Sequence, residues 1–145
     1  MNTSLLQVNG KTVPEVCQIT STLLGKPVLF AERFGAGANS RIYRLTCGDL
    51  EKYVAKFYFR HLTDTRDRLT VEFSSLSLLW TEGITNIPRP VAVNRDESCA
   101  IYEFIEGEKM AGEEITINDI DYAVDFLVKL KGLKESPSGQ NIPPA

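Results

Sequence analysis

The sequence predicts an α+β domain built on a small twisted antiparallel sheet of about five strands. Two observations support this prediction. Helical and strand-like periodicities alternate along the chain in the order helix, three strands, helix, two strands, helix. The strand-like segments are joined by short glycine-rich or charged turns, which suit antiparallel neighbours. With 145 residues the chain is the size of one domain and is large enough to bury a hydrophobic core.

The first predicted element is an N-terminal helix over residues 12–24. Thr12 and Glu15 have the spacing of a capping box, in which each residue satisfies a free backbone N–H of the first turn. Apolar residues then recur at helical spacing, and Gly25 ends the pattern.

Three strands are expected next, over residues 28–34, 41–46 and 53–59, because these segments are rich in aromatic and β-branched residues. A glycine-rich turn at 35–40 separates the first two, and a second turn at 47–49 leads into the third. The three segments are close enough in sequence to form an antiparallel meander.

A second helix is predicted over residues 64–82, where apolar residues recur at i, i+4, i+7 and i+11 and Gly83 can end the helix. A proline-containing loop follows and leads into two strands, 91–94 and 99–105, joined as a hairpin.

A terminal helix completes the predicted order of elements. Asn118 is a suitable N-cap for it, the residues after Asn118 show one apolar face, and Gly132 is expected to end the helix. The last ten residues show no core-building pattern.

Composition excludes several classes of protein. The formal net charge is −3 and no block of Lys or Arg stands out, so we expect no nucleic-acid partner. The chain has neither a signal-peptide pattern nor a run of about 20 apolar residues, so we expect no membrane association. Cys17, Cys47 and Cys99 are scattered and odd in number, which argues against a disulfide framework or a cysteine-ligated zinc site. A cytoplasmic location is expected.

The glycine-rich turn between the first two strands is the first candidate for a functional site. Its small residues allow backbone N–H groups to approach a phosphate closely, although a plain hairpin turn is the alternative interpretation. No Gly-Lys-Ser/Thr follows, so the turn is not a Walker loop. A strand follows it where a dinucleotide-binding fingerprint requires a helix.

Lys56 and Glu72 form the second candidate. Val54, Lys56 and Tyr58 share one face of a strand, and a lysine between apolar neighbours is unusual unless it meets an anion. Glu72 falls inside the apolar stripe of the second helix, where an unpaired carboxylate is costly. We therefore expect Glu72 to pair with Lys56. A lysine reaching water from an edge strand, and a carboxylate at the rim of the stripe, are the alternatives.

Together these features resemble the N-terminal lobe of the aminoglycoside phosphotransferase/choline kinase family, relatives of the protein kinases. The likeness covers residues 27–107 and continues more loosely to residue 131. The turn resembles the kinase glycine loop, with Ser40 in place of the third glycine, and the segment Tyr53–Phe57 resembles the third strand. The proline-containing stretch at 88–91 resembles the family's approach to the fourth strand.

This resemblance implies an ATP site. Lys56 would pair with the α- and β-phosphates, and Glu72 would orient Lys56, so these two are the expected catalytic residues. Val54 and Ile42 would enclose the adenine, and the segment 102–107 would act as the hinge whose backbone bonds the adenine edge. The expected nucleotide-binding residues are Gly35, Ala36, Gly37, Ala38, Asn39, Ser40, Ile42, Val54, Lys56, Tyr102, Glu103, Phe104 and Ile105.

The chain departs from the family in the motifs of the second lobe. The His/Asn-Gly-Asp-type catalytic loop and the metal-binding aspartate are absent, and His61 lies too early to supply that loop. We expect residues 1–26 to be an N-terminal helical extension, 27–107 the kinase-like lobe, and 108–145 a linker and helix leading to a second lobe that this chain lacks. Magnesium is expected only with that lobe, and the chain alone is expected to be a truncated, inactive piece.

The sequence thus predicts the nucleotide-binding lobe of an ATP-dependent small-molecule phosphotransferase. Aminoglycosides, choline-like amines, homoserine and sugars are all compatible acceptors, which the absent lobe would mainly hold. A non-catalytic binding module built on the same lobe is the alternative. The apolar surface left near Phe104, Ile105, Phe126 and Leu127 predicts self-association.

Overall fold

The structure is a computed structural model that describes residues 10–35, 37–60 and 62–141. Five strands form one antiparallel open sheet with the order β1-β2-β3-β5-β4, which confirms the predicted α+β fold. The elements in chain order are α1 (Val13–Leu24), β1 (Val28–Arg33), β2 (Ser40–Cys47), β3 (Lys52–Tyr58), α2 (Arg68–Thr81), β4 (Pro90–Asn94), β5 (Cys99–Glu103), the 3₁₀ helix η2 (Gly112–Glu114), α3 (Ile117–Lys134) and the 3₁₀ helix η3 (Gly139–Asn141).

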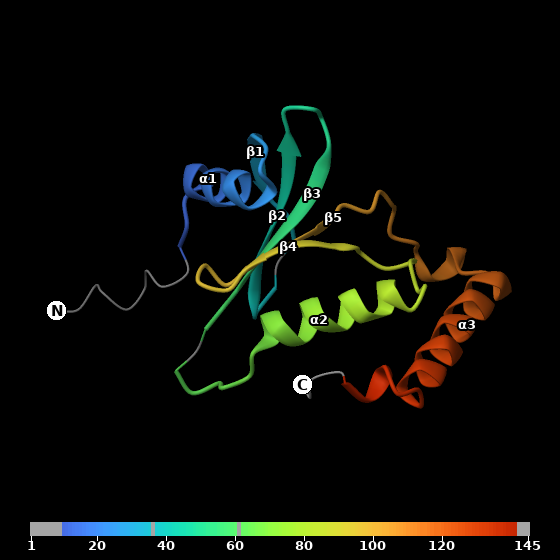
Figure 1. Cartoon of the computed structure of the whole chain (residues 1–145). Coiled ribbons are helices and arrows are strands. Elements are labelled where there is room, and N and C mark those ends of the chain that lie inside the picture. The colour runs from blue at the N-terminus through green and yellow to red at the C-terminus, as the bar shows by residue number, and fades with distance from the viewer. Residues whose placement is uncertain (1–9, 36, 61, 142–145) are drawn as a thin grey trace.

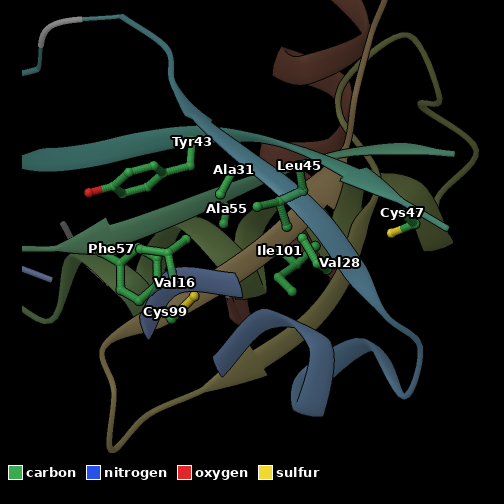
Figure 2. Close-up of a cluster of buried hydrophobic side chains, with 10 residues drawn as sticks. All are labelled: Val16, Val28, Ala31, Tyr43, Leu45, Cys47, Ala55, Phe57, Cys99 and Ile101. Carbon is green, nitrogen blue, oxygen red and sulfur yellow. The ribbon is translucent and has the colours of Figure 1, made fainter. Parts of the chain in front are cut away.

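Helices α1 and α2 cover opposite faces of the sheet, which gives a three-layer arrangement (Figure 1). The larger core lies between the sheet and α1, and Leu45 and Ile101 are fully buried in it (Figure 2). The smaller core lies between the sheet and α2, where Tyr58 and Tyr102 pack against Leu69. The two faces of the central strands therefore pack against different helices, one against α1 and the other against α2.

Strand β3 alternates between these two cores as a pleated strand must. Ala55 and Phe57 belong to the core under α1. Tyr58 belongs to the core under α2, and Val54 and Lys56 line pockets that α2 also lines. The predicted shared face of Val54, Lys56 and Tyr58 is thus present.

The ends of α1 follow the predicted signals. Thr12 and Glu15 form the capping box, with the Thr12 backbone N–H donating to the Glu15 carboxylate at 2.6 Å. Gly25 lies in the left-handed region at φ 68° and ends the helix.

Helix α2 begins at Arg68, four residues later than predicted. Asp67 is the N-cap, because its carboxylate accepts the backbone N–H of Thr70 at 3.0 Å. Asp64, the predicted first residue, instead lies ahead of the helix and pairs with Arg66 and Arg68. Apolar periodicity located the body of this helix, but the capping side chain sets its first residue.

Strand β5 and helix α3 also differ from the prediction at their ends. The strand ends at Glu103, so Phe104 and Ile105 lie beyond the ladder. Thr116, and not Asn118, is the N-cap of α3, since it forms a capping box with Asp119 in which the Thr116 N–H donates at 2.7 Å. The predicted stop at Gly132 is wrong: the helix passes through Gly132 and ends at Lys134.

Helix α3 lies apart from the three layers, to one side of the sheet and beyond the end of α2 (Figure 1). Of its residues, only Leu133 is buried. Five of its aliphatic side chains are each at least half exposed: Ile117, Ile120, Val124, Leu127 and Val128. Within the described ranges, no helix is both long enough and apolar enough to cross a membrane.

Candidate functional site

An ion pair joins the sheet to α2 at the centre of the candidate site. Lys56 of β3 extends its ammonium group to the Glu72 carboxylate of α2, with Nζ 2.9 Å from Oε1 and 2.7 Å from Oε2. The expected pairing of these residues is confirmed. The two side chains are 23% and 36% exposed, so the pair is partly shielded from solvent but accessible to a ligand.

Two buried tyrosines, Tyr58 and Tyr102, lie next to the Lys56–Glu72 ion pair. The ring of Tyr58 lies 5.0 Å from Lys56 Nζ, a cation–π distance, and its hydroxyl lies 2.8 Å from the hydroxyl of Tyr102. Burial first, and then the neighbouring Tyr102 and Glu72, raise the pKa of Tyr58, so its phenol stays neutral. Phe73 of α2 packs on Tyr102 with ring centroids 6.1 Å apart. Lys56 thus contacts the ring of Tyr58 on the sheet as well as Glu72 on α2.

A mostly apolar pocket of about 280 Å³ opens on one side of the ion pair. We call it the apolar pocket. Its walls come from β2, β3, the end of β5 and α2, and Phe34 meets Phe104 there edge to face with ring centroids 6.1 Å apart. The lining residues are Phe34, Ile42, Val54, Lys56, Glu72, Leu76, Pro88, Tyr102, Glu103, Phe104 and Ile105. A flat apolar group fits such a lining.

A second pocket, of about 340 Å³, opens on the other side of the pair. We call it the polar pocket. It lies between the start of β2, the end of β3 and the first turns of α2. The lining residues are Asn39, Ser40, Lys56, Tyr58, Arg66, Arg68, Val71 and Glu72. Lys56 and Glu72 line both pockets, so the ion pair stands at the junction between them.

The residues predicted to bind nucleotide divide between these pockets. Ile42, Val54 and the four predicted residues from Tyr102 to Ile105 line the apolar pocket, and Asn39 and Ser40 line the polar one. Gly35, Gly37 and Ala38 line neither, and Ala36 lies outside the described residues.

The glycine-rich loop has a conformation that two of its glycines favour. Gly35 lies in the left-handed region at φ 77°, where a side chain would be strained. A Cβ at Gly37 would lie 3.1 Å from the backbone oxygen of Ser40, so a larger residue would force the turn to shift. Asn39 then leads into β2, whose first residue, Ser40, is 6% exposed.

The arginines of the polar pocket are site residues that the sequence interpretation missed. Arg66 and Arg68 precede and open α2, and both donate to the Asp64 carboxylate, Arg66 from Nε at 2.8 Å and Arg68 from Nη2 at 2.6 Å. These bonds, led by the one from Arg66, hold the pKa of Asp64 well below its usual range. The Asp-x-Arg-Asp-Arg spacing at 64–68 was the available signal.

No cluster of three or more His, Cys, Asp or Glu side chains suited to a metal occurs among the described residues. The described residues do form the apolar pocket and the positively charged polar pocket, which meet at Lys56. Such a pair of pockets can hold a ligand with a flat apolar head and an anionic tail.

Comparison with known proteins supports a kinase-like lobe. A family model for the phosphotransferase enzyme family matches residues 31–144. No curated protein sequence matches the chain. Among solved structures, similarity extends to a protein assigned as a fructosamine-3-kinase from Thermobifida fusca YX-ER1, with a TM-score of 0.57, 15% identity and 69% of this chain covered.

Two further structures are similar. The Rio2 kinase from Chaetomium thermophilum, in an ADP/Mg²⁺-phosphoaspartate complex, gives a TM-score of 0.58 at 19% identity over 84% of this chain. The spectinomycin phosphotransferase APH(9)-Ia, in complex with ADP and spectinomycin, gives 0.50 at 16% over 69%. The chain spans only 34%, 41% and 31% of these three proteins. At these identities the likeness concerns the fold alone.

Proposed function

The chain belongs to the phosphotransferase enzyme family, and from that premise we propose that it is the nucleotide-binding lobe of an ATP-dependent small-molecule kinase. One observation supports this proposal above the others. The Lys56–Glu72 pair, closed at 2.7 Å, stands where an apolar pocket meets a cationic one. A nucleoside polyphosphate has the matching order of an apolar base followed by anions.

In this proposal the base enters the apolar pocket, where Ile42, Val54 and Phe104 are among the lining residues. The main chain of Phe104 and Ile105 lies past the end of β5 and outside its ladder, so its polar groups can bond the edge of the base. Apolar contact and a few directed hydrogen bonds are the usual means of holding a planar ligand.

The phosphates then meet Lys56. Its ammonium neutralises charge on the two inner phosphates, and Glu72 keeps it pointed into the junction between the pockets. Asn39 and Ser40, at the end of the glycine-rich loop, line the polar pocket and can contact the phosphates there. Phosphoryl transfer depends mainly on such positioning and charge neutralisation, so this lobe contributes binding and orientation.

Magnesium would supply charge neutralisation between the outer phosphates. The described residues offer no cluster of three or more His, Cys, Asp or Glu for it, so we place its ligands outside the described residues. The acceptor, a hydroxyl compound of the aminoglycoside, amine or sugar type, is likewise assigned to the part of the kinase fold that this chain does not span.

Titration of the ¹⁵N-labelled chain with ADP, followed by NMR, tests the proposal. We expect saturable shifts at backbone amides around both pockets, including Val54 and Ile105, with weak affinity because this chain spans only part of the kinase fold. The variant Lys56→Met keeps the apolar stem and removes the charge. It should weaken binding about tenfold or more, the value of a charged hydrogen bond.

The matched control is Lys26→Met, which removes another paired lysine, bonded to Asp49 at 3.0 Å on the α1 side of the molecule. Its ADP affinity should equal that of the unchanged chain. If ADP produces no saturable shifts, or if both variants weaken binding equally, the proposed nucleotide site is wrong.

A further inference from the structure

The polar pocket carries positive charge beyond that of Lys56, whose charge Glu72 offsets. Arg66 and Arg68 line it along with Lys56. Glu72 offsets Lys56, and Asp64 offsets one of the two arginines, which leaves one positive charge in excess. Nothing in the proposed roles of Lys56 and Glu72 uses this charge.

The arginines lie on the far side of Lys56 from the base. Val54 lines the apolar pocket, Lys56 lines both pockets and Tyr58 lines only the polar one. In β2 the same order appears, since Ile42 lies opposite Lys56 and Ser40 opposite Tyr58. At about 3.3 Å per residue, the path from Val54 to Tyr58 is about 13 Å long. A ligand with its base in the apolar pocket therefore reaches the arginines only with its outermost phosphate.

The guanidinium of Arg68 is fixed in place but keeps donors that can bind an anion. Its side chain is 26% exposed, and its Nη2 donates to Asp64 at 2.6 Å. This bond fixes the guanidinium but uses one of its five donors. Arg66 is bonded to the same carboxylate through Nε and Nη2 but is 62% exposed. A planar guanidinium suits a phosphate because it can donate two parallel hydrogen bonds.

We propose that Arg68, assisted by Arg66, forms a subsite for the terminal phosphate and makes the lobe prefer nucleoside triphosphates to diphosphates. This inference rests on the proposed function of the two pockets. The excess charge in the polar pocket matches the one additional negative charge that ATP carries over ADP. Arg68 is a binding residue of this site, and the more exposed Arg66 contributes less because water screens it.

The test compares ATP with ADP on the same chain, in EDTA so that no metal contributes charge. Dissociation constants come from NMR titration of five proteins: the unchanged chain, Arg68→Gln, Arg68→Lys, Arg66→Gln and Arg95→Gln. Arg95 lines the neighbouring pocket with Arg66 and Arg68 but does not line the polar pocket, so it controls for the loss of nearby charge.

We expect the unchanged chain to bind ATP about tenfold more tightly than ADP, as one charged hydrogen-bonding contact provides. Arg68→Gln should abolish this preference by weakening ATP binding while leaving ADP binding within about twofold. Arg66→Gln should reduce the preference by less, and Arg95→Gln should leave it unchanged. Arg68→Lys, which keeps the charge but not the fork of donors, should fall between the unchanged chain and Arg68→Gln.

The outcomes separate this inference from the proposed function. If ADP binds as proposed but ATP binds no tighter, or if Arg68→Gln weakens both nucleotides equally, the terminal-phosphate subsite is wrong while the nucleotide site stands. If neither nucleotide binds, the proposed function fails and the inference fails with it. Should Arg68→Gln not fold, a reduced ATP preference in Arg68→Lys supports the subsite, and an ATP preference equal to that of the unchanged chain overturns it.

Discussion

The Lys56–Glu72 pair should stabilise the fold even without nucleotide, by an amount that its burial sets. Two unit charges 2.7 Å apart attract by about 1.5 kcal/mol in a medium as polar as water. Exposed pairs contribute about 0.2–1 kcal/mol, and breaking a buried pair costs about 3–5 kcal/mol. With exposures of 23% and 36% the pair lies between these cases, so we expect a coupling energy of about 1–2 kcal/mol.

A double-mutant cycle measures that coupling. Lys56→Met and Glu72→Gln are made singly and together, because both keep the size of the side chain, and each protein is unfolded in urea at pH 7. The double variant should be less destabilised than the sum of the single variants by the coupling energy. Additivity within about 0.3–0.5 kcal/mol, the usual result for independent sites, would refute the view that this pair anchors α2 to the sheet.

Three further outcomes follow from which side chains are buried and which are exposed. Leu45→Ala, at a fully buried position of the core under α1, should lower the free energy of unfolding by about 2–5 kcal/mol in urea denaturation. Burial raises the pKa of the Cys99 thiol to about 12, so at pH 8 a thiol reagent followed by mass spectrometry should modify the partly exposed Cys17 long before Cys99, and equal rates would contradict the core packing. The exposed aliphatic face of α3 should make the chain self-associate, and Leu127→Glu should shift the sedimentation coefficient toward that of the monomer; a clean monomer at high concentration before mutation would count against this.

Much of the fold could be predicted because local signals and burial agree along most of the chain. The capping box at Thr12, the alternation along β3 and the left-handed glycine after α1 each follow from short-range chemistry. The Lys56–Glu72 pair was predictable for a different reason. A carboxylate inside an apolar stripe requires a partner, and Lys56 lies on the face of the sheet beneath that stripe.

The differences arose where two side chains compete for one structural role. Both Thr116 and Asn118 are good helix caps, and the reciprocal bond between Thr116 and Asp119 decides the start of α3. Gly132 lies inside the helix because a glycine lowers helix stability by only about 1 kcal/mol and does not have to end it.

The arginines of the polar pocket illustrate a limit of another kind. Along the sequence Arg66 and Arg68 belong to a charged stretch at the start of a helix. Their relation to Lys56 arises only when α2 packs on the sheet and brings its first turn beside the end of β3. Proximity of this sort depends on tertiary packing, which periodicity does not encode.

Chemical labelling by a nucleotide that reacts with lysine shows whether Lys56 lies against the phosphates of a bound nucleotide. In an acyl-phosphate derivative of ATP, a lysine amine that lies against the phosphates attacks the acyl carbon and is acylated, and the nucleotide leaves. Mass spectrometry of the labelled chain then identifies the lysine. We expect Lys56 to be acylated first and excess ATP to protect it. Labelling that is spread over exposed lysines such as Lys52 and Lys129, with Lys56 unmodified or unprotected by ATP, would contradict it.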